Sequence, residues 1–137
     1  MTAERFLDTN ILVYAYDTDA AAKRTVAVQL VEAGWTHPGL TAISVQVLQE
    51  LYVNLERRAV PRDQAVQIIG DFTDWPIVPN TLELLHSAFA EQARWRLALW
   101  DALILAAARA SGAAELITED LNHGQDYGGV RVRNPFR

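Results

Sequence analysis

Residues 5–12 read Arg5-Phe6-Leu7-Asp8-Thr9-Asn10-Ile11-Leu12, so that a short apolar run stops at an aspartate and a second apolar run starts three residues later. A short apolar run ended by polar residues predicts a buried strand, and Asp, Thr and Asn are common where helices begin. We therefore expect a strand, a turn and then a helical segment that reaches Tyr16. This arrangement places Asp8 at the carboxyl end of the strand.

Short apolar strands and amphipathic helices alternate along the rest of the chain. Further strands are expected at residues 40–43, 75–79, 116–118 and 130–132, and further helices at 20–32, from 45 to about 55, 61–72, from 81 into the nineties, and 97–108. Gly34 is expected to end the first of these helices, Ser44 to cap the second and Pro61 to open the third. This order predicts an α/β fold with helices on both faces of a central, mainly parallel sheet of four to five strands.

The composition narrows the class of protein. The chain has 137 residues, half of them hydrophobic, which suits one folded domain over residues 1–137 without an internal repeat. It has no cysteine and its three histidines are scattered, so a disulfide framework and a thiolate zinc site are excluded. No apolar run approaches the roughly 20 residues that cross a bilayer, and residues 1–5 lack the features of a signal peptide. We expect a cytoplasmic protein without membrane contact.

The charge balance is acidic. A formal net charge of -5 argues against a broad cationic surface of the kind that usually binds nucleic acid. Of the 12 basic residues only Lys23 is a lysine. Arginine is better suited than lysine to paired hydrogen bonds with phosphate, although a GC-rich genome produces the same bias. Composition alone therefore leaves nucleic-acid binding open.

Four acidic residues from separate segments are expected to meet. Asp8 and Asp120 follow strands, while Glu50 and Asp101 lie on helices that border the edge of the sheet where open α/β folds place their functional crevice. Each has an ordinary explanation by itself: a helix cap, a polar loop, an exposed helix edge, or an interaction with a helix dipole. Together they would repel one another unless a cation neutralised them. Mg²⁺ or Mn²⁺ is the natural occupant, and phosphodiester hydrolysis becomes the leading hypothesis.

Four segments resemble a known family. They are FLDTNIL at 6–12, SVQVLQELY at 44–52, WDALI at 100–104 and LITEDL at 116–121. In this order and spacing, over nearly the whole chain, they are similar to PIN-domain proteins of the VapC toxin type. Each segment is weak evidence by itself, but four in order make a specific pattern.

The resemblance implies a PIN-like, Rossmann-like three-layer α/β/α fold and a Mg²⁺-dependent endoribonuclease, with Mn²⁺ as the alternative ion. It implies that Asp8, Glu50 and Asp101 are the three recurring acids and that Asp120 is the fourth, all four serving in metal binding and catalysis. Cleavage would leave a 5′-phosphate and a 3′-hydroxyl on the RNA. A further set would orient the carboxylates or the attacking water: Thr9, Asn10, Thr118 and Glu119, the last of which is also the alternative to Asp120.

Substrate and partners follow from the same resemblance. It implies a homodimer and inhibition by a VapB-type antitoxin. Trp95 and Trp100 are candidates for a surface between subunits or toward the antitoxin, with ordinary core packing as the alternative. Four arginines near the acidic helices are candidates for guiding RNA, with solvated surface as the plainer interpretation: Arg57, Arg58, Arg94 and Arg96.

Two other classes of protein remain to be distinguished. Haloacid-dehalogenase-like phosphatases and response-regulator receivers also begin with an apolar strand that ends in an aspartate, which accepts a phosphoryl group beside Mg²⁺. They need a lysine later in the chain, but the only lysine is Lys23, and Asn10 stands where the phosphatases have a second aspartate. A non-catalytic module whose acids bind a basic partner is the second alternative, and no sequence feature excludes it.

Overall fold

Two short apolar segments form the centre of the fold. In the computed structural model, which describes residues 2–137, they are β1 (Arg5–Leu7) and β4 (Glu115–Ile117), paired in parallel. The last two residues of each strand are fully buried, as expected of strands that helices cover on both faces. Met1, with which the predicted domain begins, lies outside the described residues.

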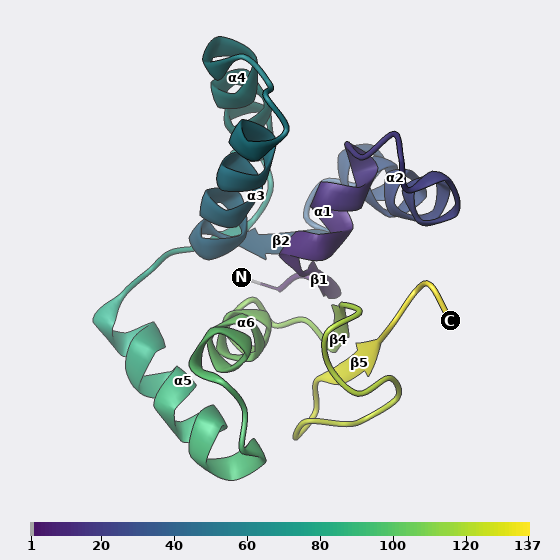
Figure 1. Cartoon of the computed structure of the whole chain (residues 1–137). Helices are drawn as coiled ribbons and strands as arrows, with labels where there is room; N and C mark the ends of the chain where they lie inside the picture. The colour runs from purple at the N-terminus through teal and green to yellow at the C-terminus, as the bar shows by residue number, and fades with distance from the viewer. Residues whose placement is uncertain (1) are drawn as a thin grey trace.

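The other elements follow in the predicted order (Figure 1). They are α1 (Thr9–Ala15), α2 (Ala21–Thr36), β2 (Thr41–Ser44), α3 (Val45–Arg57), α4 (Arg62–Phe72), β3 (Ile77–Val78), α5 (Leu82–Trp95), α6 (Leu99–Ala110) and β5 (Arg131–Arg133). Every strand and helix expected from the sequence is present, within a few residues of its expected bounds. Between residues 2 and 137, no helix has both the length and the apolar character needed to span a bilayer.

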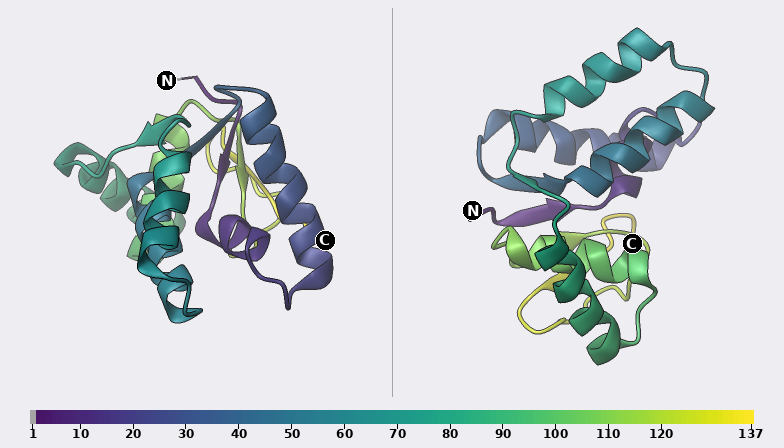
Figure 2. Two further views of the ribbon diagram at one scale, coloured as in Figure 1. Left: turned by 90° about the horizontal axis from the view of Figure 1, so that it is seen from above. Right: turned by 90° about the vertical axis from the view of Figure 1, so that its left-hand side faces the viewer.

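The sheet has five strands, all parallel, in the order β3-β2-β1-β4-β5. The chain goes outward from β1 to β2 and β3, and then returns across the sheet to β4 and β5. Because such crossovers are right-handed, the helices that precede β3 cover one face, while α5 and α6 cover the other. The right-hand view of Figure 2 shows β1 between α3 and α4 on one side and α5 and α6 on the other. The predicted three-layer α/β/α architecture is confirmed.

The reversal in strand order places a crevice beside β1. Connections from neighbouring parallel strands separate at such a point and leave an opening at the carboxyl ends of the strands. Asp8 directly follows β1, and Thr118 directly follows β4. The fold therefore brings the two strand ends that carry polar residues to the same opening.

One predicted helix boundary is wrong. Gly34 does not end α2, which continues to Thr36. Gly34 is buried inside the helix, and a Cβ atom at this position would overlap the ring of Trp75. Position 34 therefore requires glycine because α2 packs closely against the segment before β3, and not because a helix ends there in a left-handed conformation.

Candidate active site

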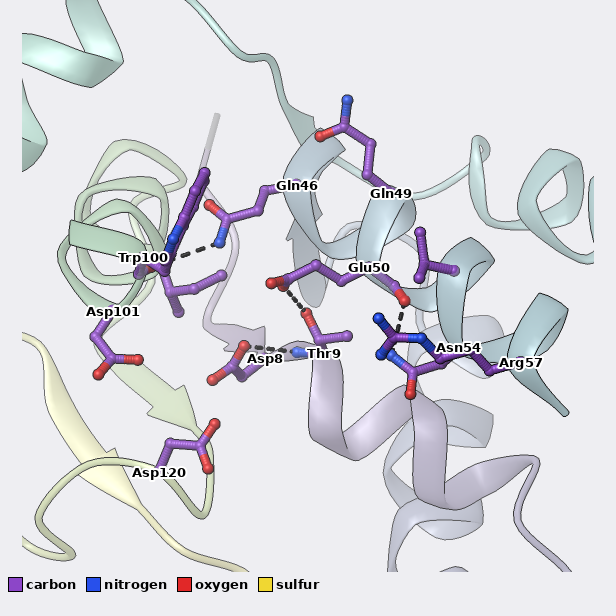
Figure 3. A pocket seen from close by; sticks show the side chains of 12 residues that line it. Asp8, Thr9, Gln46, Gln49, Glu50, Asn54, Arg57, Trp100, Asp101 and Asp120 are labelled. Atoms are coloured by element: carbon purple, nitrogen blue, oxygen red, sulfur yellow. Dashed lines mark hydrogen bonds between the residues drawn. The ribbon is translucent and has the colours of Figure 1, made fainter. Parts of the chain in front are cut away.

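The four acids predicted to meet line one cavity. Asp8, Glu50, Asp101 and Asp120 border a space of about 490 Å³ at the carboxyl ends of β1 and β4, beside α3 and the start of α6. We call it the acidic cavity. Figure 3 shows the carboxylates of Asp8, Asp101 and Asp120 turned toward a common space, with Glu50 reaching in from α3. Only the fold brings these residues together, because they come from four separate segments.

Asp8 is the most buried of the four acids. Its carboxylate caps α1 by accepting a hydrogen bond from the backbone N–H of Thr9 (2.7 Å), and it accepts another from the hydroxyl of Thr118 (2.8 Å). Burial raises the pKa of Asp8 to about 7, although these two hydrogen bonds lower it, and the charges of Asp120 and Glu50 add to the rise. The buried carboxylate therefore pays a large desolvation cost when it ionises without a cation nearby.

Glu50 faces the cavity because of how α3 packs. The helix is capped by Ser44, as predicted, and its apolar face is buried against β2 and α4. The polar edge formed by Gln46, Glu50 and Asn54 consequently lines the acidic cavity. An exposed helix edge is therefore the wrong interpretation of this pattern. The hydroxyl of Thr9 donates a hydrogen bond of 2.6 Å to the carboxylate of Glu50 and fixes its direction.

Asp101 lies in the first turn of α6, where its charge interacts favourably with the helix dipole. Its side chain is half-buried and lines the acidic cavity. Burial, followed by the charges of Asp120 and Glu50, raises the pKa of Asp101. Asp101 therefore both interacts with the dipole of α6 and lines the acidic cavity.

The two neighbouring acids after β4 have different surroundings. Asp120 lines the acidic cavity and accepts a hydrogen bond from the side-chain amide of Asn10 (3.1 Å). Glu119 instead accepts hydrogen bonds from the hydroxyl of Tyr14 (2.6 Å) and from the ammonium group of Lys23 (2.9 Å). Partial burial works to raise the pKa of Glu119, but these hydrogen bonds lower it overall. The structure therefore brings Asp120 to the cavity and holds Glu119 away from it.

Neutral polar side chains connect the acids. The amide of Asn10 donates to Asp120 and to the hydroxyl of Thr118 (3.2 Å), and makes a longer contact of 3.4 Å with Asp8. The hydroxyl of Thr118 also accepts from the backbone N–H of Asp120 (3.1 Å). Together with the hydrogen bond from Thr9 to Glu50, these contacts hold the carboxylates of Asp8, Glu50 and Asp120 in place.

The four acids lack ion-pair partners among residues 2–137. Within the described part of the chain, none of them forms an ion pair with a Lys, Arg or His residue. Among the same residues, no three acidic or histidine side chains stand close enough to share an ion as they are placed. This differs from the expected ligand cluster, because like charges repel and hydrogen bonds hold Asp8 and Glu50 in place. The donors still fit Mg²⁺, since they are oxygens without counter-charge, and Mg²⁺ commonly binds one or two carboxylates and completes its shell with water.

The predicted RNA-guiding arginines lie in different places. Arg57 lines the acidic cavity. Arg58 forms an ion pair of 3.1 Å with Asp17. Arg94 stacks its guanidinium over the ring of the residue that follows it, 4.4 Å from the centroid, and Arg96 ends α5 in a left-handed conformation. Neither Arg94 nor Arg96 borders the cavity.

The two tryptophans near Asp101 also differ. Trp95 packs its ring against Tyr127, with centroids 5.2 Å apart, which favours core packing. Trp100 is 64% exposed and lines the acidic cavity. The structure thus adds Trp100 and Gln49 to the cavity wall, and their only sequence signal is that each directly precedes one of the predicted acids.

Comparison with known proteins identifies the family of this chain. A sequence profile of the PIN domain matches residues 5–125. The chain belongs to the PIN-domain family. A curated relative in Mycobacterium tuberculosis, named Ribonuclease VapC24, is 29% identical, and the alignment covers 95% of each chain.

Solved structures share the same fold. A chain of a toxin-antitoxin complex from Klebsiella pneumoniae superimposes with a TM-score of 0.68 at 26% identity, covering 96% of this chain and 98% of that one. A DNA-bound VapBC complex from Salmonella typhimurium gives a TM-score of 0.70 at 15% identity, covering 98% and 99% of the two chains. The resemblance to PIN-domain proteins of the VapC type, predicted from four sequence segments, is confirmed.

Proposed function

We propose that this PIN-domain protein is a Mg²⁺-dependent endoribonuclease and the toxin of a VapBC-type toxin-antitoxin pair. The observation that carries the proposal is the acidic cavity, which four carboxylates line and in which, among the described residues, none is neutralised by an ion pair. Similarity to a protein named Ribonuclease VapC24 supports the choice of RNA as the substrate. We also propose that residues 1–137 act as one domain, in the cytoplasm.

The acids have distinct proposed roles. Asp8 and Asp101 would hold one Mg²⁺, for which Mn²⁺ could substitute, and Glu50 and Asp120 would help to hold that ion or a second one. When bound, the ion supplies Lewis acidity that activates water and offsets negative charge on the scissile phosphate. Thr9, Thr118 and Asn10 keep the carboxylate oxygens in place through the hydrogen bonds described above; Glu119, held by Tyr14 and Lys23, supports the same loop from outside the cavity.

Substrate handling follows from the remaining wall of the cavity. Arg57 is proposed to bind an RNA phosphate, because a guanidinium group pairs well with phosphate oxygens and this one borders the acids. Burial raises the pKa of Asp8 and of Asp101 when no cation is nearby, so a cation in the cavity would favour their ionised forms. Attack of water in line with the leaving 3′-oxygen produces a 5′-phosphate and a 3′-hydroxyl.

We further propose a VapB-type antitoxin as the protein partner and a homodimer as the assembly. Uncompensated carboxylates in an open cavity attract a basic side chain, which a protein inhibitor can supply. The Klebsiella pneumoniae structure to which this chain is similar is a toxin-antitoxin complex. Sedimentation that detects only monomer over a wide concentration range would remove the dimer from the proposal.

Incubation of the purified protein with a pool of cellular RNA and Mg²⁺ tests the activity. We expect new 5′-phosphate ends, which disappear with a chelator and in Asp101→Asn. Asp63→Asn is the matched control, because the Asp63 side chain is fully exposed on α4, away from the cavity. Binding of RNA without any cleavage by the unaltered protein would contradict the enzyme and favour the acidic binding module.

The phosphoryl-acceptor alternative finds no support in the cavity. Lys23, the only lysine, pairs with Glu119 and contacts Tyr14. It does not border Asp8, where a phosphate would need it. Formation of an acid-labile aspartyl-phosphate on Asp8 from a small phosphodonor would support this alternative against the nuclease.

A further inference from the structure

A second hollow adjoins the acidic cavity. It has a volume of about 420 Å³ and lies between α3, the start of α5 and the start of α6. Gln46, Gln49 and Trp100 line both spaces, so the second hollow continues from the first. None of the residues that line it carries a formal charge; beyond the three shared ones, they are Asn80, Thr81 and four leucines. We call it the neutral groove.

Trp100 lines both spaces and is the most exposed of the four tryptophans, at 64%. The other three pack against aromatic rings within the described chain: Trp35 and Trp75 with each other and with Phe72, and Trp95 with Tyr127. Between residues 2 and 137, no ring stacks on Trp100. Its backbone is nevertheless held, because Gln46 contacts its carbonyl oxygen at 3.5 Å. The exposed ring of Trp100 is thus left as an aromatic surface for a ligand.

The lining of the neutral groove also includes two side-chain amides that contact each other, those of Asn80 and Gln49. The side-chain amide of Asn80 donates to the side-chain carbonyl of Gln49 at 3.1 Å. Within residues 2–137, the side-chain carbonyl of Asn80, an acceptor, and the side-chain amide nitrogen of Gln49, a donor, have no hydrogen-bond partner. Such a pair suits the hydrogen-bonding edge of a nucleobase.

We propose that the neutral groove is a subsite for one unpaired nucleobase next to the scissile phosphate, with the base stacked on Trp100. The inference rests on the proposed ribonuclease function and deepens it by assigning a base-binding residue and a base-binding groove to this chain. The two neighbouring spaces match the two parts of a nucleotide: the acids and their cation take the phosphate, and the uncharged groove takes the neutral base. Stacking on an indole accepts any base, because every base has a π face.

The test measures binding of a fluorescein-labelled, hydrolysis-resistant phosphorothioate RNA of eight nucleotides and mixed sequence, in Ca²⁺ to prevent turnover. Trp100→Ala is expected to weaken binding by about 5- to 100-fold, the range that loss of one base–aromatic stack produces, and Trp100→Phe is expected to restore part of the affinity. Phe89→Ala is the matched control, since Phe89 is 48% exposed on α5 and lines neither space. Control affinity should equal that of the unaltered protein.

Abasic nucleotides make the test specific. Each position of the probe is replaced in turn by an abasic residue. At one position this replacement should weaken binding to the unaltered protein but should not weaken binding to Trp100→Ala any further. Equal binding by Trp100→Ala and the unaltered protein would overturn the subsite and leave the nuclease intact. A change from dimer to monomer in Trp100→Ala would also overturn it, by making the indole an interface residue. Absence of both RNA binding and RNA cleavage by the unaltered protein would overturn the nuclease together with the subsite.

Discussion

Replacement of Asp8 by asparagine should stabilise the metal-free protein at alkaline pH. Burial raises the pKa of Asp8 from 3.8 to about 7, and at about 1.4 kcal/mol per pKa unit this shift corresponds to about 4 kcal/mol. In the unfolded chain the carboxylate ionises near pH 4, so the folded state holds an extra proton between about pH 4 and pH 7. Stability therefore falls as pH rises through this window, and above it the full cost of a buried charge remains. Because an asparagine amide is also polar and fits the hydrogen bonds less well, we expect a gain of about 2–4 kcal/mol at pH 8.

Urea unfolding in a chelator, at pH 5 and pH 8, measures this effect. Asp8→Asn should be more stable than the unaltered protein at pH 8, and the difference should shrink at pH 5. Mg²⁺ at 100 times its dissociation constant should remove most of the difference at pH 8, because it adds about 2.7 kcal/mol to the state that binds it and the asparagine lacks the charge to hold it. An unaltered protein that is already more stable than Asp8→Asn at pH 8 without metal would refute the reasoning.

Three further predictions test other parts of the structure. Asp101→Asn should lower RNA cleavage by about 100-fold or more with unchanged thermal unfolding, measured with a labelled RNA; retained activity would remove Asp101 from the site. Arg57→Glu should weaken RNA binding by about 10-fold at low salt and Arg94→Glu should not, because only Arg57 borders the cavity; equal effects in fluorescence anisotropy would contradict this difference. Gly34→Ala should lower the free energy of unfolding by about 1–3 kcal/mol, because its Cβ would meet Trp75. Gly70→Ala, in open space on α4, should raise it by about 0.5–1 kcal/mol. Urea unfolding measures both changes, and a change of the same sign in the two variants would disprove the packing argument.

Periodicity in the sequence was enough to predict the order of the elements. Strands buried on both faces are short apolar runs, and three of the predicted helix starts, Asp8, Ser44 and Thr81, accept capping hydrogen bonds in the structure. Gly34 shows the limit of this reasoning. A glycine required by a ring from another segment looks the same in the sequence as one required by a turn.

Site residues that depend on tertiary packing were harder to predict. The edge of Gln46, Glu50 and Asn54 has the spacing of an exposed helix face, and only the packing of α3 on β2 and α4 turns it toward the acids. The choice between Glu119 and Asp120 likewise depends on Lys23, which reaches Glu119 from nearly a hundred residues earlier. Contacts between segments so far apart cannot be predicted from the local sequence.

The distances among the four acids also lay beyond the sequence. Their shared cavity followed from the topology of a parallel sheet, in which Asp8 and Asp120 come after neighbouring strands. The four acids stand apart among the described residues, which agrees with mutual repulsion and with the hydrogen bonds that hold Asp8 and Glu50.

Anomalous diffraction from crystals of this protein soaked in Mn²⁺ tests the central claim most directly. The account predicts one or two manganese peaks inside the acidic cavity, with carboxylate oxygens of Asp8 and Asp101 within coordination distance of one of them. Manganese bound only elsewhere, or a cavity that stays free of metal at millimolar Mn²⁺, would contradict it.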